Sequence, residues 1–417
     1  MGEVMTSHVI DWFAGIDWGS ERHQVCVLSS SGEIVAERDF VHTGAGLAEL
    51  GAWLAKIAGE APKMAVGIEV PHGPVVDLLL DRSFVVYAIN PKQLDRLRDR
   101  FSMAGSKDDR RDARVAASGL RTDRHLFRLV QACDPATVEL REWSRLAEEL
   151  QQDRVRLCNR LRQQLWRYYP QFLELVDDMG AEWLLELWTI APTPGRAMRL
   201  RSSTVARLLT RHRIRRFDAS SVLGILRKPT IQVAAGVTEA ATLHVRSLIA
   251  RLRLANQELR TAEKRLDELL QQRVGNESRA QDREPSDAAI LTSLPGIGRV
   301  ALAILLAEAS DPLSRRDYAA LRALSGVAPV TKRSGKSRIV SMRYAAHPRL
   351  RNAVFYWVRA AVQNDAEVRR RYQALRQRGH SYGRALRGLA DRLLGVACIL
   401  LHRREMFDPT RRSPKTT

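Results

Sequence analysis

Two aspartates three residues apart, Asp109 and Asp112, begin the stretch of the chain best suited to metal chemistry. The alanine-rich run after them favours a helix, on which this spacing places both carboxylates on one face. Neighbouring carboxylates repel each other unless a cation neutralises them, and oxygen ligands suit divalent cations. The alternative is a solvated charged turn in which Lys107 and nearby arginines neutralise the acids, and the pair alone leaves both interpretations open.

Two further acids, Asp17 and Glu69, each follow an apolar segment that is typical of a buried β-strand. The predicted order of elements is a strand hairpin, helix, strand, helix, strand and helix, which favours parallel strand pairing. Parallel pairing would bring Asp17 and Glu69 to the same edge of one mixed sheet, with the Asp109/Asp112 helix packed beside them. Four carboxylates without His or Cys favour Mg²⁺ or Mn²⁺ over zinc.

The middle of the chain is predicted to be helical. An amphipathic helix is expected over residues 136–169, and apolar residues follow a seven-residue repeat over 240–272, which is typical of a coiled coil. This repeat must pair either with the earlier long helix, in an antiparallel arrangement, or with the same helix of another subunit. Residues 171–236 are expected to form small helices with a basic surface.

A Pro-Gly-x-Gly turn precedes a predicted helix near residue 300. Backbone N–H groups at Gly296 and Gly298 could bind a phosphate there, next to the positive end of the helix dipole. This arrangement is typical of a helix-hairpin-helix, which contacts the DNA backbone without recognising sequence. The alternative is a plain turn between two helices.

A basic segment over residues 331–338 is predicted to be a flexible loop. It carries Ser334 among the cations Lys332, Arg333 and Lys336. The serine could attack a phosphodiester while the cations stabilise the developing charge. A basic loop of this kind could also serve only to bind phosphate.

The composition of the chain points to a polyanionic partner. Its 417 residues favour two or three domains, and 67 Lys and Arg against 47 Asp and Glu give a net charge of +20. The four scattered cysteines form no metal-binding pair and fit a reducing compartment. We find no signal peptide and no apolar run long enough for a membrane span, so we expect a cytoplasmic protein.

In this order, the motifs resemble those of the insertion sequence 110 family of transposases. That family combines a DEDD-type RuvC-like domain with a C-terminal serine domain and is associated with a bridge RNA. The matching segments are Gly15-Ile16-Asp17, Val66-Gly67-Ile68-Glu69, Ile89-Asn90-Pro91, Lys107-x-Asp109-x-x-Asp112-Ala113, Leu294-Pro295-Gly296-Ile297-Gly298, Gly326-Val327-Ala328-Pro329 and Ser334-Gly335-Lys336.

The chain departs from the family pattern at two places. Asp108 stands where the family usually has Thr, which leaves open which two of the three neighbouring acids bind metal. Ser341-Met342-Arg343-Tyr344 stands where the family usually has Ser-Lys-Arg-Gly, so Ser341 is a lesser rival to Ser334.

The resemblance implies a transposase or site-specific recombinase that cuts and rejoins DNA, in the cytoplasm of a bacterium and associated with the nucleoid. It implies Asp17, Glu69, Asp109 and Asp112 as metal ligands and Ser334 as the nucleophile. It also implies a homo-oligomer, a dimer or a tetramer, whose active site is shared between the carboxylate domain of one subunit and the serine domain of another. A bridge RNA would guide it, and the helical middle would serve assembly and RNA binding.

The predicted fold class is α/β plus α, without membrane association. An RNase H/RuvC-like mixed sheet is expected over residues 1–125, and a helical coiled-coil region over 126–285. An all-helical domain with the helix-hairpin-helix is expected over 286–405, before a disordered basic tail over 406–417. Two alternative functions are a metal-dependent endonuclease of DNA junctions, with water as nucleophile, and a catalytically inactive nucleic-acid-binding protein.

Overall fold

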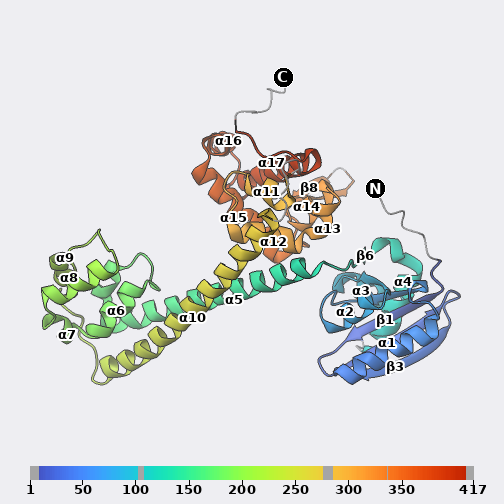
Figure 1. Ribbon diagram of the computed structural model, residues 1–417, viewed down its shortest axis with the longest axis horizontal. Coiled ribbons are helices and arrows are strands. Elements are labelled where there is room, and N and C mark those ends of the chain that lie inside the picture. Colours follow the sequence, from blue (N-terminus) through green and yellow to red (C-terminus); the bar gives the residue numbers. More distant parts are fainter. Residues whose placement is uncertain (1–8, 102–107, 276–284, 336, 410–417) are drawn as a thin grey trace. The chain divides into compact units, whose positions relative to one another are not determined.

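The computed structural model describes residues 9–101, 108–275, 285–335 and 337–409 (Figure 1). The chain divides into two compact units, Met1–Cys133 and Asp134–Thr417. No helix among the described residues is long and apolar enough to cross a membrane.

The first unit is built on a six-stranded sheet with the order β3-β2-β1-β4-β5-β6. Its strands are β1 (Trp12–Trp18), β2 (Arg22–Ser29), β3 (Ile34–Val41), β4 (Met64–Ile68), β5 (Val85–Ala88) and β6 (Arg128–Leu129). Strands β1, β4 and β5 are parallel, whereas β2, β3 and β6 pair antiparallel with their neighbours. The predicted hairpin and parallel pairing are confirmed, and this mixed sheet is consistent with a RuvC-like fold. Because β6 pairs with β5, the sheet unit extends beyond the expected boundary at residue 125.

Helices cover both faces of this sheet. They are α1 (Gly44–Ala58), α2 (Pro74–Asp81), α3 (Pro91–Arg98) and α4 (Asp109–Asp123), with short 3-10 helices η1 (Ala61–Lys63) and η2 (Arg124–Leu126). Helices α1 and α2 share a core with one face, to which Ile16 and Ile68 belong. Helices α3 and α4 share a core with the opposite face, to which Phe13 and Ala65 belong.

The second unit contains the two longest helices, α5 (Pro135–Tyr168) and α10 (Val237–Gly275). They pack against each other in opposite directions, because Arg265 near the end of α10 binds Glu139 near the start of α5, while Arg154 binds Asn256. The seven-residue repeat places eight residues on one seam of α10. Leu259 is partly buried and the other seven are buried: Val245, Leu248, Leu252, Ala255, Ala262, Leu266 and Leu269. The sequence left two partners open for this seam, and in the structure it packs against α5 of the same chain.

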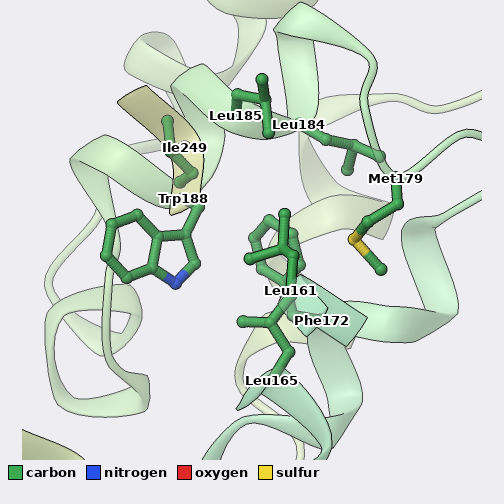
Figure 2. Close-up of a pocket in the computed structure, with 8 residues that line it drawn as sticks. All are labelled: Leu161, Leu165, Phe172, Met179, Leu184, Leu185, Trp188 and Ile249. Atoms are coloured by element: carbon green, nitrogen blue, oxygen red, sulfur yellow. The ribbon is translucent and has the colours of Figure 1, made fainter. Parts of the chain in front are cut away.

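Small helices surround one end of the α5/α10 pair (Figure 1). They are η3 (Pro170–Leu175), α6 (Glu182–Ile190), α7 (Pro194–Met198), α8 (Ser202–Arg211) and α9 (Ala219–Leu226). Their shared core includes Leu161 of α5, Trp188 of α6 and Ile249 of α10, and these side chains leave no room for a water molecule (Figure 2). The small helices predicted for this region are therefore present.

The C-terminal elements share a second core with the other end of the pair. They are α11 (Asp287–Thr292), α12 (Arg299–Glu308), α13 (Ser310–Ser314), α14 (Tyr318–Leu324), β7 (Val330–Ser334), β8 (Ser337–Ser341), α15 (Pro348–Asn364), α16 (Ala366–Gln377) and α17 (Tyr382–Arg403).

Two expectations for this region were wrong. The domain is not all-helical, because the segment expected as a flexible basic loop forms the antiparallel hairpin β7–β8. The many cations of residues 331–338 led to the prediction of a loop. The β-branched residues Ile339 and Val340, which directly follow them, favour a strand. The disordered tail does not begin at residue 406, since the backbone N–H of Phe407 donates to the Ser293 hydroxyl at 2.8 Å. Residues 410–417 lie outside the described part.

Candidate active site

Asp17 lies near the end of β1 and Glu69 directly follows β4, and these two parallel strands are aligned residue by residue. Gly15 lies opposite Gly67, and Ile16 lies opposite Ile68, so the two acids occupy the next pair of positions. Side chains alternate along a strand, and both isoleucines point into the core under α1 and α2. Both acids therefore project toward the face that α4 covers, at the same edge of the sheet, as the sequence predicted.

A glycine stands two residues before each acid, and Gly15 allows α4 to lie close to the sheet. A Cβ atom at Gly15 would stand 2.1 Å from the carbonyl oxygen of Ala113, which is far inside van der Waals contact. A Cβ at Gly67 would stand 2.8 Å from Cδ1 of Ile89 and 3.6 Å from the carbonyl oxygen of Ala116 in α4. The close approach of α4 is therefore required at Gly15, whereas Gly67 is crowded mainly by Ile89. Because Ala113 touches β1 at Gly15, its neighbour Asp112 is brought to the same edge.

Three acids with different surroundings lie at the start of α4, one at its N-cap and two in its first turn. Asp108 caps the helix, since its carboxylate accepts a hydrogen bond from the backbone N–H of Arg110 at 3.3 Å. Threonine is also a good N-cap, so the family's Thr and this Asp can serve the same structural purpose. Asp109 is exposed, whereas the side chain of Asp112 is only 1% exposed. The helix dipole also favours acids in the first turn of a helix. Stabilisation of α4 is therefore an alternative to metal binding as the role of Asp109.

Arg98 at the end of α3 holds the buried acid. Its Nε donates to one oxygen of Asp112 at 2.5 Å and its Nη2 donates to the other at 2.7 Å. These bonds raise the pKa of the guanidinium, and the nearby charges of Asp95 and Glu69 raise it further. The sequence did not indicate Arg98, because nothing in the spacing of α3 and α4 shows which arginine reaches Asp112.

The carboxylates at this edge have the chemistry of a site for a hard divalent cation. Asp17, Glu69 and Asp112 come from three separate elements, and Arg98 now supplies positive charge to one of them. Among the described residues, no group of three or more acidic, His or Cys side chains is close enough to hold an ion in this conformation. The ligand role of these acids, and of Asp109, stays a prediction.

Ser334 is the last residue of β7, at the tip of the β7–β8 hairpin. It lies opposite Ser337, and Gly335 follows it with a left-handed φ of 53° that suits a tight turn. Ser334 is exposed, as are Lys332 and Arg333. Lys336 lies outside the described residues. The rival Ser341 ends β8 at the base of the hairpin, where it is half-buried.

The turn between α11 and α12 has a packing function. Gly296 has a φ of 73°, and a Cβ there would stand 2.3 Å from the backbone nitrogen of Ala361 in α15. The carbonyl of Pro295 accepts a hydrogen bond from Nε1 of Trp357 at 3.0 Å. Gly298, at the N-cap of α12, is exposed with open space around it. Gly296 is thus explained by close helix packing, and phosphate binding by the turn stays a prediction.

Comparison with known proteins gives matches along the whole chain. A profile of DEDD-type IS110 transposases matches residues 14–170, and one described as transposase IS116/IS110/IS902 family matches residues 288–373. The protein assigned as the mini-circle transposase for IS117 in Streptomyces coelicolor is 31% identical over 412 residues, which is 96% of each chain. The chain belongs to the IS110 family of transposases.

A second relative of this IS110-family chain is more similar over a shorter range. It is the protein assigned as transposase y4uE in Sinorhizobium fredii, 59% identical over 220 residues, which are 52% of this chain and 61% of that one. The first family match contains all four predicted ligands, and the second contains Gly296, Gly298 and Ser334. Residues 171–287, which include α6–α9, lie between the two matches.

Proposed function

We propose that this IS110-family chain is the recombinase of an insertion sequence, which cuts DNA and rejoins it with a serine nucleophile. The observation that carries the proposal is the aligned pair Asp17 and Glu69 at one sheet edge, with Asp112 on the helix packed against it. An exposed serine at the tip of a basic hairpin supports the second half of the proposal.

In the proposed reaction, Oγ of Ser334 attacks a DNA phosphorus and forms a phosphoserine ester. The bond from that phosphorus to the 3′ oxygen breaks, and the serine proton passes to the leaving 3′ oxygen. The 3′-hydroxyl of a partner strand then attacks the phosphoserine and releases the serine. Lys332 and Arg333 stabilise the negative charge that develops on the phosphate oxygens.

Asp17, Glu69, Asp109 and Asp112 would hold Mg²⁺ or Mn²⁺. When bound, such an ion orients a phosphodiester and polarises it for attack. The proposal further takes DNA as substrate, a bridge RNA as guide and a dimer or tetramer as the working assembly. Base pairing by the guide would then recognise sequence, and the protein would contact mainly the backbone.

Recombination between a donor and a target plasmid tests this function. Both plasmids carry the DNA that flanks the reading frame, and the flanking RNA is expressed with the protein. We expect Ser334→Ala, Asp109→Asn and Asp112→Asn to abolish recombination, and Ser341→Ala to retain it. Retained activity in Ser334→Ala would remove the serine from the mechanism and favour a nuclease that activates water.

Sharing of one active site between subunits has its own test. Ser334→Ala and Asp112→Asn proteins are each expected to be inactive, whereas a mixture of both should recover part of the activity. A mixture as inactive as its components would rule out a shared site, without bearing on the roles of the two residues.

A further inference from the structure

The segment around α7, α8 and α9 carries a large share of the positive charge of the chain. Ten residues of 191–236 are Arg or Lys and one, Asp218, is acidic, which is a net charge of +9 out of +20 for the whole chain. This segment lies outside both family matches. The proposed chemistry at Ser334 and the acids does not use it.

Most of these arginines have no side-chain partner among the residues that the structure describes. Three of the segment's cations are paired, Arg211 with Glu186, Arg216 with Asp177, and Lys228 with Glu174. Six others are exposed and make no side-chain hydrogen bond or ion pair within the described residues. We call these the arginine surface: Arg196, Arg199, Arg201, Arg207, Arg213 and Arg215.

A buried core fixes this surface in place. Helix α8 buries Val205 and Leu208 against the neighbouring helices, which leaves Arg207 on its exposed side. Arg201 is the N-cap of α8 and Arg213 follows its end. At the rise of a helix these two lie about 18 Å apart, roughly half a turn of a DNA duplex. Because the backbone beneath these cations is already ordered, binding has to order only their side chains.

Arg213 adopts a backbone conformation that its side chain disfavours. Its φ is 54°, and its N–H donates to the carbonyl of Thr210 just after the C-cap of α8. Helices usually place Gly or Asn at such a position, because other residues are strained there. We take the presence of arginine at this strained position as an indication that its charge has a function.

The surroundings of the arginine surface favour a double-stranded ligand. Single-stranded nucleic acids are gripped by exposed aromatic side chains on which their bases stack. Within residues 171–236 the aromatic residues are buried or half-buried instead: Phe172, Trp183, Trp188 and Phe217. Trp166 of α5 is exposed but lies outside this segment. Exposed arginines in a segment whose own aromatic residues are covered suit phosphate groups, to which a guanidinium can donate two parallel hydrogen bonds.

We propose that the arginine surface binds the phosphate backbone of a nucleic-acid duplex. This duplex binding is separate from the predicted active site, so we expect it to persist without divalent metal and without Ser334. The phosphate chemistry is common to DNA and to the paired regions of a folded RNA, and the experiment distinguishes these two sources.

The test compares two triple variants of the full-length chain with the same change of charge. Arg199→Gln, Arg207→Gln and Arg215→Gln remove unpaired arginines. The matched control removes the exposed, paired cations by Arg156→Gln, Arg211→Gln and Lys228→Gln. Fluorescence anisotropy without divalent metal measures binding to a DNA duplex, an RNA duplex and a single strand of equal length, over a range of salt concentrations.

We expect the first triple variant to lose at least tenfold in affinity for one of the two duplexes, and the control to lose little. On DNA the slope of log affinity against log salt should fall by roughly 2 to 3, since each phosphate contact contributes about 0.9. The duplex that loses affinity identifies the source of the ligand. Equal losses in both triple variants, unchanged binding in the first, or an equal loss on the single strand would each overturn the proposal.

The variant Arg213→Gly tests duplex binding without destabilising the fold. Glycine relieves the left-handed strain, so the melting temperature should stay the same or rise while duplex affinity falls several-fold. Unchanged affinity in this variant would remove Arg213 from the surface.

Discussion

Arg98 donates one hydrogen bond to each carboxylate oxygen of Asp112, and the pair fastens the end of α3 to the first turn of α4. The Asp112 side chain is 1% exposed and that of Arg98 is 24% exposed. A buried carboxylate requires such a partner, because an unpaired charge is costly away from water. Arg98 therefore supplies to this predicted metal ligand the positive charge that a divalent cation would supply.

Replacement of Arg98 by Gln should lower the free energy of unfolding but raise the affinity for Mn²⁺. The buried Asp112 carboxylate would lose its partner, so we expect unfolding to become easier by about 3 kcal/mol. Loss of the competing cation should at the same time tighten Mn²⁺ binding, as measured by titration calorimetry. Arg96→Gln, on an exposed position of the same helix, is the matched control. Equal Mn²⁺ affinity in the two variants would argue against Asp112 as a ligand.

Replacement of Gly15 by Ala should disturb the predicted site through the packing of α4. The added Cβ would meet the Ala113 carbonyl at 2.1 Å, so the helix must move away from the sheet. We expect a loss of about 3 kcal/mol in the free energy of unfolding, at the upper end for overpacking. Gly44→Ala in the same unit, where nothing lies within 4 Å, should change it far less. Scanning calorimetry measures both, and similar melting of the two variants would show that α4 adjusts freely.

Glu308 should make the second unit sensitive to acid. Its side chain is 6% exposed and forms ion pairs with Arg145 of α5 and Arg349 of α15. Burial acts to raise its pKa, but the arginines and His347 outweigh burial and lower the pKa below the usual 4.5. A lowered pKa contributes stability above pH 4.5 that is lost as the pH falls through the folded value.

Denaturant unfolding over a range of pH checks this contribution. Glu308→Gln should cost about 2 kcal/mol near neutral pH, because it removes the buried carboxylate to which Arg145 and Arg349 both donate, and should flatten the loss below pH 4.5. Glu142→Gln, at an exposed acid that also pairs with Arg145, should change little. An acid transition unaltered by Glu308→Gln would assign the acid sensitivity to other groups.

The parts of the site that follow strand periodicity were predictable from the sequence. Asp17 and Glu69 end short apolar segments, and the alternation of helix and strand favoured the parallel pairing that aligns them. Asp112 could be placed on the same helix face as Asp109 by spacing alone. Its pairing with Arg98 could not, because an ion pair between two helices depends on their packing rather than on local sequence.

The serine region shows where local pattern was misleading. The charges around Ser334 suggested a loop, although β-branched residues and Gly335 form a hairpin. The sequence also did not show that Gly296 is required by its contact with Ala361, and phosphate binding by this turn stays a prediction. In both places the decisive interactions are made with residues distant in sequence or across a strand pair.

The most direct test of the account is the covalent bond between Ser334 and DNA. The full-length protein is incubated with Mg²⁺, RNA from the flanking region and DNA carrying the element ends, then denatured, digested and mapped by mass spectrometry. The account predicts a nucleotide attached to the peptide through Ser334, absent from Ser334→Ala and retained in Ser341→Ala. Cleaved DNA without any protein adduct, or an adduct on another residue, would contradict it.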